Sequence, residues 1–191
     1  RRIPIPGLPP DRYLTNESLF DIAAPPGHLA VIGAGAIGLE MATAFRRLSC
    51  RVTLIDLADR VLPTASPDAS AVLHESAGAL DIDVRLAVHV TDYEPTTRCL
   101  RLTGDGGDSS IADVDAVLVA IGRVPNTEDI GLDRAGVAAG PEGIAVNAWG
   151  RTSVKSVWAV GDVTPGSHTT HGANALGRRI IQRIALPWLP A

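Results

Sequence analysis

LAVIGAGAIGLEMATAFRRLSCRVTLID, residues 29–56, predicts a strand, a tight turn, a helix and a second strand in that order. The first apolar run, 29–32, is short enough for a buried parallel strand, and 52–55 has the same character. Between the two runs, apolar side chains recur at helical spacing at Ile37, Met41, Ala44, Phe45 and Leu48. The stretch therefore predicts a βαβ unit, the building block of a parallel sheet in an α/β fold.

Three glycines at the turn, Gly33, Gly35 and Gly38, have the spacing G-x-G-x-x-G. The first allows the tight turn, the second lets a phosphate approach the backbone, and the third lets the helix pack closely on the strand. The helix start, at Ala36 and Ile37, offers unpaired backbone N–H groups and a positive dipole end to a pyrophosphate. We interpret the pattern as a dinucleotide site; the alternative is a glycine-rich turn that binds nothing.

An acidic residue, Asp56, ends the second strand and is placed to accept hydrogen bonds from the ribose hydroxyls of the adenosine. A carboxylate there would repel a 2′-phosphate, so the sequence favours NAD(H) over NADP(H). Arg60 follows four residues later. With Asp56 in place, we interpret it as a loop or adenine-side arginine, and the alternative is a ligand of the 2′-phosphate.

The formal net charge of the 191 residues is −4, which argues against nucleic acid or an anionic membrane as a partner. The two cysteines, Cys50 and Cys99, form no CxxC pair and indicate a reducing compartment. No signal peptide is visible, so we expect a cytoplasmic protein. The first residue is Arg, which suggests a piece of a longer chain. His168 and His171 lack a third candidate ligand, so no metal site is predicted.

The middle of the chain predicts further elements of an α/β domain. A helix begins at Pro67. Residues 82–90 and parts of 98–103 alternate apolar and polar residues, and a turn cluster at 104–108 separates them from the next run, which predicts a small antiparallel ribbon. The run 114–122 predicts a strand buried on both faces that returns to the main sheet. It ends in a turn at 122–126, at the sheet edge where ligands bind, and Ile121, Gly122 and Arg123 are candidate cofactor-binding residues there. Gly122 is interpreted as exposing backbone to a nicotinamide; the alternative is an ordinary strand-to-loop glycine.

The last third predicts two short strands, 144–146 and 157–160, the second followed by Gly161 and Asp162. A helix is expected over 171–186, where Ile180, Ile181 and Ile184 would share one face.

Several of these stretches also carry recognisable motifs. They are PGLP (6–9) with LTNESLFDI (14–22), VIGAGAIGLE (31–40), DRVLP (59–63), AIGRVPN (120–126) and TSVKSVWAVGDV (152–163). In this order they resemble the flavin-dependent pyridine nucleotide-disulfide oxidoreductases, which include dihydrolipoamide dehydrogenase, glutathione reductase and mercuric reductase. The resemblance covers almost the whole chain.

The resemblance implies a Rossmann-like parallel sheet with helices on both faces and a small antiparallel ribbon, followed by the returning part of an FAD domain. Residues 1–23 would be the linker from the FAD domain, 24–143 the NAD(H)-binding domain, and 144–191 the incomplete C-terminal FAD segment. By the same resemblance, Asp162, after Gly161, would hold a ribityl hydroxyl of FAD. Glu40 would lie near the flavin as a catalytic residue, but its lysine partner is absent from this chain.

The implied parent protein passes hydride from NADH to FAD and on to a disulfide or another acceptor. Its partners would be a nicotinamide dinucleotide, the rest of the FAD domain and a dimerisation domain, within a homodimer. The family's CxxxxC redox pair is absent from these 191 residues, so we expect this segment alone to be inactive. The alternative is a stand-alone dinucleotide-binding module without turnover.

Overall fold

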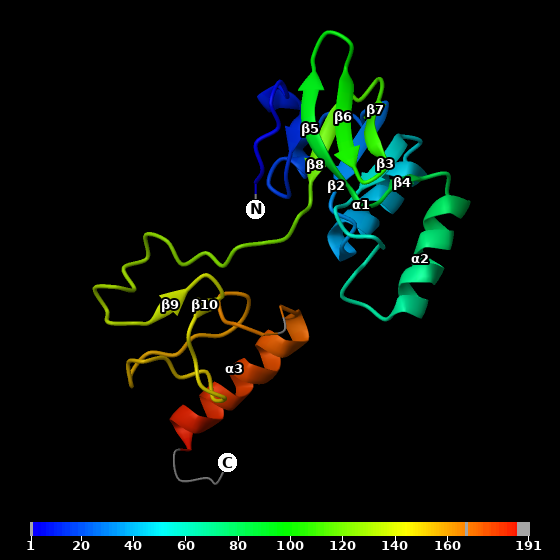
Figure 1. Ribbon diagram of the computed structural model, residues 1–191. Coiled ribbons are helices and arrows are strands. Elements are labelled where there is room, and N and C mark those ends of the chain that lie inside the picture. The colour runs from blue at the N-terminus through cyan, green and yellow to red at the C-terminus, as the bar shows by residue number, and fades with distance from the viewer. Residues whose placement is uncertain (1, 167, 187–191) are drawn as a thin grey trace. The chain divides into compact units, whose positions relative to one another are not determined.

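The computed structural model describes residues 2–166 and 168–186, and it divides into two compact units, 1–122 and 123–191. Figure 1 shows both units. Within the described residues, no helix combines the length and the apolar character needed to cross a membrane.

A parallel sheet of five strands forms the centre of the first unit (Figure 1). In spatial order the strands are β1 (Tyr13–Leu14), β8 (Ala116–Val119), β2 (His28–Ile32), β3 (Arg51–Ile55) and β4 (Asp83–Arg85). The strands β2 and β8 are buried along their whole length, as expected for central strands covered on both faces. The α/β class and the return of the late strand to the main sheet are therefore confirmed.

Two helices cover one face of this sheet, α1 (Ala36–Arg47) and α2 (Pro67–Ala79). The buried residues of α1 are Gly38, Ala42 and Phe45. Ile37 and Leu48 are 40% and 58% exposed, so only part of the apolar stripe expected from the sequence is buried. The small residues Gly38 and Ala42 let α1 approach the sheet closely, and Phe45 is buried on the same side of the helix.

The other face is covered by an antiparallel ribbon and not by helices. Its strands are β5 (Val88–Glu94), β6 (Cys99–Gly104) and β7 (Gly107–Ile111). Tyr93, Leu100, Leu102 and Ile111 of the ribbon are buried against the sheet. The expected ribbon is confirmed with one correction. The alternating run 82–90 is divided, because β4 joins the parallel sheet before Ala87 adopts a positive φ of 54° and the chain turns into β5.

The N-terminal segment packs onto the first unit. Tyr13 and Leu14 pair with Val117 and Leu118, which makes β1 an edge strand of the sheet. Leu14 and Leu19 are buried in the core beneath α1. This segment also contains the single-turn helices η1 (Pro10–Arg12) and η2 (Leu19–Asp21).

The second unit contains a two-stranded antiparallel sheet and one long helix (Figure 1). The strands are β9 (Ala139–Gly140) and β10 (Gly143–Ile144), and the helix is α3 (Thr170–Ala185). The strand expected at 157–160 is not formed among the described residues, where Trp158 makes only a single bridge with Arg151. A strand needs a neighbouring backbone along its length, and the sequence pattern does not reveal whether one is present.

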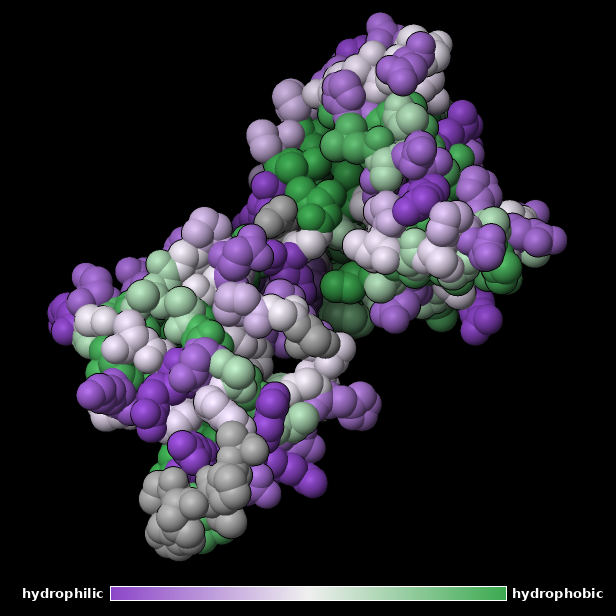
Figure 2. All heavy atoms as spheres, turned by 60° about the horizontal axis from the view of Figure 1, so that its bottom comes forward, coloured by the Kyte–Doolittle hydropathy of each residue, from purple (hydrophilic) through white to green (hydrophobic). Residues whose placement is uncertain are grey.

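Helix α3 is confirmed, but its isoleucines do not share a buried face. Ile180 is buried, whereas Ile181 and Ile184 are 67% and 58% exposed. Apolar side chains reach the surface of both units, as the green residues among the purple in Figure 2 show.

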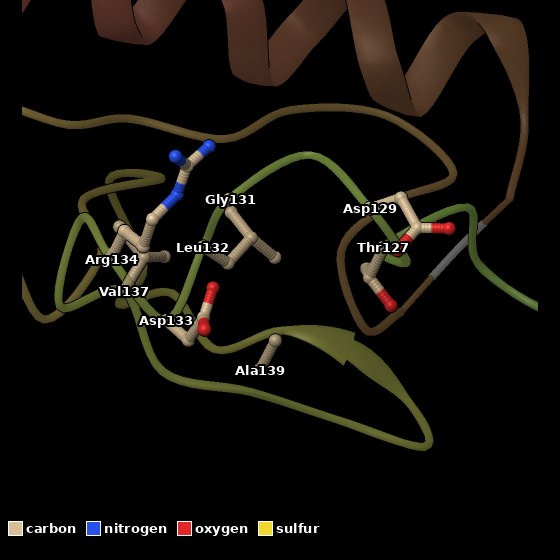
Figure 3. Close-up of a pocket in the computed structure, with 8 residues that line it drawn as sticks. All are labelled: Thr127, Asp129, Gly131, Leu132, Asp133, Arg134, Val137 and Ala139. Carbon is tan, nitrogen blue, oxygen red and sulfur yellow. The ribbon is translucent and has the colours of Figure 1, made fainter.

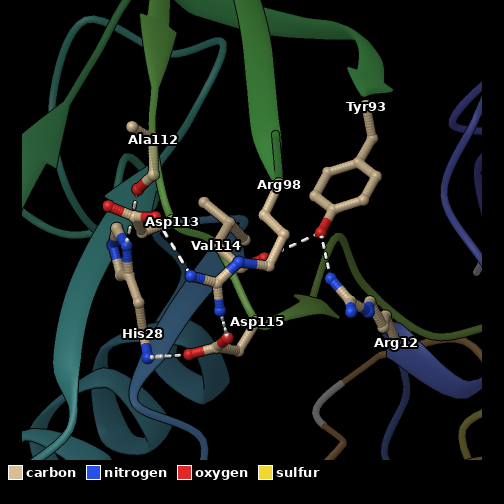
Figure 4. A network of polar contacts seen from close by, with 8 residues as sticks. All are labelled: Arg12, His28, Tyr93, Arg98, Ala112, Asp113, Val114 and Asp115. Carbon is tan, nitrogen blue, oxygen red and sulfur yellow. Dashed lines mark hydrogen bonds and ion pairs between the residues drawn. The ribbon is translucent and has the colours of Figure 1, made fainter. Parts of the chain in front are cut away.

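A polar network ties the ribbon to the amino end of the sheet (Figure 4). Asp115 accepts the backbone N–H of His28 at 2.9 Å and pairs with Arg98, which also pairs with Asp113 at 3.0 Å. On the far side, the Tyr93 hydroxyl donates to the carbonyl of Val114 at 2.8 Å. The same hydroxyl accepts from Arg12 at 2.6 Å, so Tyr93 links the ribbon both to the segment before β8 and to the N-terminal segment.

Replacing Asp115 should destabilise the first unit, because Asp115→Ala removes the acceptor of the His28 N–H and the partner of Arg98. We expect a loss of about 1–3 kcal/mol in the free energy of unfolding, measured by urea denaturation. Asp113→Ala is the matched control. The Asp113 side chain is 66% exposed, so its ion pair with Arg98 should contribute about 0.5 kcal/mol or less to the free energy of unfolding. Equal losses in the two variants would contradict the network described here.

The buried imidazole of His28 makes stability depend on pH. Burial, and then the charge of Arg51, lower the pKa of His28 below its ordinary value of 6.5. The unfolded chain therefore binds more protons below that pH, and the free energy of unfolding should fall as the pH drops from 7 to 5. His28→Gln should flatten this dependence, whereas His74→Gln, at an exposed position, should leave it unchanged in denaturation series at each pH.

Candidate functional site

Three loops meet at the carboxyl edge of the parallel sheet. Because β8, β2 and β3 are neighbours, the segments that follow them lie next to one another at this edge. After β2 the chain adds β3 and β4 on one side of β2 and later returns to add β8 on the other side. The direction of strand addition therefore reverses between β2 and β8. In open α/β sheets, ligands bind at such a switch point.

The glycine-rich turn after β2 is closely packed at two of its glycines and open at the third. A Cβ at Gly33, whose φ is +109°, would lie 2.6 Å from the carbonyl oxygen of Ala120. A Cβ at Gly38 would lie 1.7 Å from the carbonyl oxygen of Gly33. At Gly35 a Cβ would meet no atom within 4 Å. The space beside Gly35 is therefore not filled by other atoms of the protein.

The N-terminus of α1 begins at this open glycine. Its N-cap residue is Gly35, which provides no side-chain hydrogen bond to the helix. By contrast, Ser66 and Thr169 accept backbone N–H groups at the starts of α2 and α3. The first-turn N–H groups of α1, including those of Ala36 and Ile37, have no acceptor within the helix. They can hold an anionic group at the edge of the sheet.

Asp56 lies at the end of β3 and faces the glycine-rich turn. Its Oδ2 accepts the backbone N–H of Ala34, and its Oδ1 accepts that of Ala58 at 2.8 Å. Each carboxylate oxygen has a second lone pair, so the half-buried side chain can still accept ligand hydroxyls. The sequence placed Asp56 at this edge, but it did not predict the bond to Ala34.

Arg60 is held beside α2. Its guanidinium donates to the carbonyl of Pro63 at 2.9 Å and lines a hollow of about 430 Å³ with Ser70 and His74. Glu40 is exposed on α1. At the end of β8, Ile121 is half-buried and Gly122 is exposed with a φ of +106°.

In the second unit, the structure brings together two of the predicted site residues. Arg123 and Asp162 lie 3.9 Å apart and line a hollow of about 230 Å³. Gly161, beside them in the chain, has a φ of +85°. His168 also lines the hollow, and no spacing signal in the sequence connected it to Arg123.

A separate cavity of about 490 Å³ lies between the loop that follows Thr127 and strand β9. Figure 3 shows Asp129, Asp133 and Arg134 among the residues that line it, and none of the predicted site residues is in its lining. Among the described residues, no three His, Cys, Asp or Glu side chains are grouped so as to hold a metal ion.

Comparisons with known proteins identify the family of this chain. The family model described as "Pyridine nucleotide-disulphide oxidoreductase" matches residues 1–177. Dihydrolipoyl dehydrogenase 3 of Pseudomonas aeruginosa is 34% identical over 187 residues, which are 95% of this chain and 40% of that protein. Mercuric reductase of Staphylococcus aureus is 34% identical over 164 residues, which are 85% of this chain and 30% of that protein.

Solved structures show the same fold. The flavoprotein disulfide reductase RclA of Escherichia coli, described as HOCl-induced, superposes with a TM-score of 0.87 at 27% identity, over 100% of this chain and 43% of that one. LpdA of Mycobacterium tuberculosis superposes with a TM-score of 0.83 at 30% identity, over 100% of this chain and 41% of that one.

Nearly the whole of this chain matches these curated relatives, but it spans only about 40% of their length. These relatives are named as enzymes, so nothing in them favours a stand-alone binding module. The family expected from the motifs is confirmed. This chain belongs to the pyridine nucleotide-disulphide oxidoreductase family.

Proposed function

We propose that this chain is the NAD(H)-binding portion of an FAD-dependent oxidoreductase, in which hydride passes from NADH to FAD and on to a disulfide or another acceptor. One observation carries the proposal. At a single sheet edge, the open face of Gly35, the uncapped start of α1 and the carboxylate of Asp56 lie side by side.

The cofactor would lie across this edge. Its pyrophosphate would bind the backbone N–H groups of Ala36 and Ile37, next to Gly35. The adenosine ribose would donate its hydroxyls to Asp56, and the nicotinamide would lie beside Ile121 and Gly122, at the end of β8. The protein's contribution to hydride transfer is then positioning, because the chemistry belongs to the cofactors.

We further propose a preference for NAD(H) over NADP(H). A 2′-phosphate would approach the negative charge of Asp56, which can accept hydrogen bonds but cannot donate them. Arg60, the cation four residues along the loop, donates to the carbonyl of Pro63. It is proposed to lie on the adenine side and not to hold a phosphate.

FAD in the parent protein would use the second unit. The side chain of Asp162 is 59% exposed, so its carboxylate is free to accept a ribityl hydroxyl, and Arg123 lines the same hollow. The positive φ of Gly161 turns the backbone immediately before this carboxylate. When bound, the flavin would supply the hydride acceptor. Glu40 is proposed to lie near the flavin, which its exposure on α1 permits.

For the parent protein we propose the domain division 1–23, 24–143 and 144–191, a homodimer and a cytoplasmic location. The 191-residue chain alone should bind dinucleotide without turnover, since it contains no CxxxxC redox pair. Its net charge of −4 supports partners that are neither nucleic acid nor an anionic membrane.

Two glycine variants separate binding from folding. Gly35→Ala places a methyl group where no protein atom lies within 4 Å, so stability should be unchanged while NADH affinity falls about tenfold or more. Gly38→Ala should destabilise the fold by several kcal/mol, because its Cβ would overlap the Gly33 carbonyl. Thermal unfolding and calorimetric titration with NADH measure both effects. Unchanged NADH binding in Gly35→Ala would contradict a pyrophosphate site there.

The cofactor preference is tested by calorimetric titration of the chain with NADH, NADPH and FAD in parallel. We expect tighter binding of NADH than of NADPH, and weaker binding of NADH in Asp56→Ala. The NADH-to-NADPH affinity ratio should move toward one in that variant, because the charge opposing a 2′-phosphate is removed. Asp59→Ala removes the same charge from the same loop and should leave the ratio unchanged. Equal binding of NADH and NADPH by the unmodified chain would refute the preference.

A further inference from the structure

The peptide unit of Ala34, within the glycine-rich turn, is held from two sides. Its N–H donates to the Oδ2 of Asp56, and its carbonyl accepts the N–H of Leu62 at 2.8 Å. The preceding N–H, that of Gly33, donates to the carbonyl of Ile55 at 2.7 Å. The turn that precedes α1 is therefore fixed by residues 55–62, and one of these bonds comes from a side chain.

The segment that holds Ala34 is itself anchored. The backbone N–H of Asp56 donates to Arg85 at 2.9 Å, and its carbonyl accepts from Val88 at 3.1 Å. Ala58, whose N–H binds the Oδ1 of Asp56, accepts the N–H of Ala87 at 2.9 Å. The carboxylate of Asp56 thus joins the glycine-rich turn to a segment that is hydrogen-bonded to the connection between β4 and β5.

The burial of Ala34 makes this carboxylate difficult to replace. Ala34 is 0% exposed, so water cannot easily serve its N–H if the acceptor is lost. A buried donor without a partner costs more than the hydrogen bond contributed, so the turn would relax to find another acceptor. Such relaxation would move Gly35 and the first N–H groups of α1, which follow directly in the chain.

We infer that Asp56 is a positioning residue for the glycine-rich turn, in addition to the ribose contact proposed above. The inference deepens the proposed function and rests on it for the identity of the ligand. The carboxylate holds Ala34 through one lone pair of Oδ2 and keeps other lone pairs for hydroxyl groups. One side chain thereby orders the phosphate-binding backbone and contacts the sugar.

For a ligand without ribose hydroxyls, a charge-only role and a positioning role of Asp56 predict opposite changes in binding affinity when Asp56 is replaced by asparagine. If Asp56 acted only through its charge, Asp56→Asn would tighten the binding of an anion, because a nearby negative charge is removed. If Asp56 positions the turn, the same variant weakens that binding, because the asparagine amide can place a donor against the Ala34 N–H. The probe is 2′,3′-dideoxy-ADP, which keeps the adenine and the diphosphate but lacks both hydroxyls.

The first measurement needs no ligand. Amide hydrogen exchange at Ala34 should be at least tenfold faster in Asp56→Asn than in the unmodified chain. Asp59→Asn is the matched control, because it removes the same charge from the same loop. Asp59 is exposed and makes no hydrogen bond to the residues that the structure describes. An Ala34 exchange rate unaffected by Asp56→Asn would overturn the inference.

A second measurement on the unmodified chain covers the case in which Asp56→Asn does not fold. The Ala34 amide proton resonance should move with the side-chain carboxyl resonance of Asp56 in one acid titration followed by NMR. An Ala34 resonance that does not follow the Asp56 carboxyl would overturn the inference without any variant.

The third measurement is calorimetric titration with 2′,3′-dideoxy-ADP. We expect Asp56→Asn to bind it at least threefold more weakly than the unmodified chain, and Asp59→Asn to bind it equally or more tightly. Equal or tighter binding by Asp56→Asn would overturn the inference. If the unmodified chain binds no NADH while Ala34 exchange still depends on Asp56, the proposed function fails and the positioning role stands. If NADH binds but Ala34 exchange is independent of Asp56, the positioning role fails and the proposed function stands.

Discussion

The close approach of α1 to β2 is the contact on which the rest of the first unit depends. A Cβ at Gly38 would lie 1.7 Å from the Gly33 carbonyl oxygen, so only a glycine at position 38 lets the helix lie this near the strand. This approach places the start of α1 at the carboxyl edge of the sheet. Ala42 is buried at the same contact, where a small side chain keeps the helix near the sheet.

The carboxyl edge is stiffened by bonds between segments far apart in the sequence. Asp56 and Leu62 hold both polar groups of Ala34, and the connection after β4 holds Asp56 in turn. A turn fixed in this way before a ligand arrives loses less conformational freedom on binding, which is the general advantage of a preorganised site. The open surface at Gly35 is thus bordered by backbone whose position is already determined.

The opposite, amino edge of the sheet serves stability. There the ion pairs of Arg98 with Asp113 and Asp115, and the bond of Asp115 to His28, fasten the ribbon over the second face. The hydroxyl of the buried Tyr93 adds two hydrogen bonds, one accepted from Arg12 and one donated to the carbonyl of Val114. The proposed binding edge and this polar network therefore lie at opposite ends of the same strands.

The sequence by itself determined the features that depend on neighbouring residues. These are the strand–turn–helix–strand order of 29–56, the burial of β8 and the family motifs, all of which rest on local spacing and apolar runs. Only the tertiary structure decided which segments pair. It sends 83–85 into the sheet and 88–94 into the ribbon, and it makes 13–14 an edge strand. It also gave Asp56 a bond to Ala34, 22 residues away. Periodicity reports which side of an element is apolar but not which partner covers it, because that partner is distant in the chain.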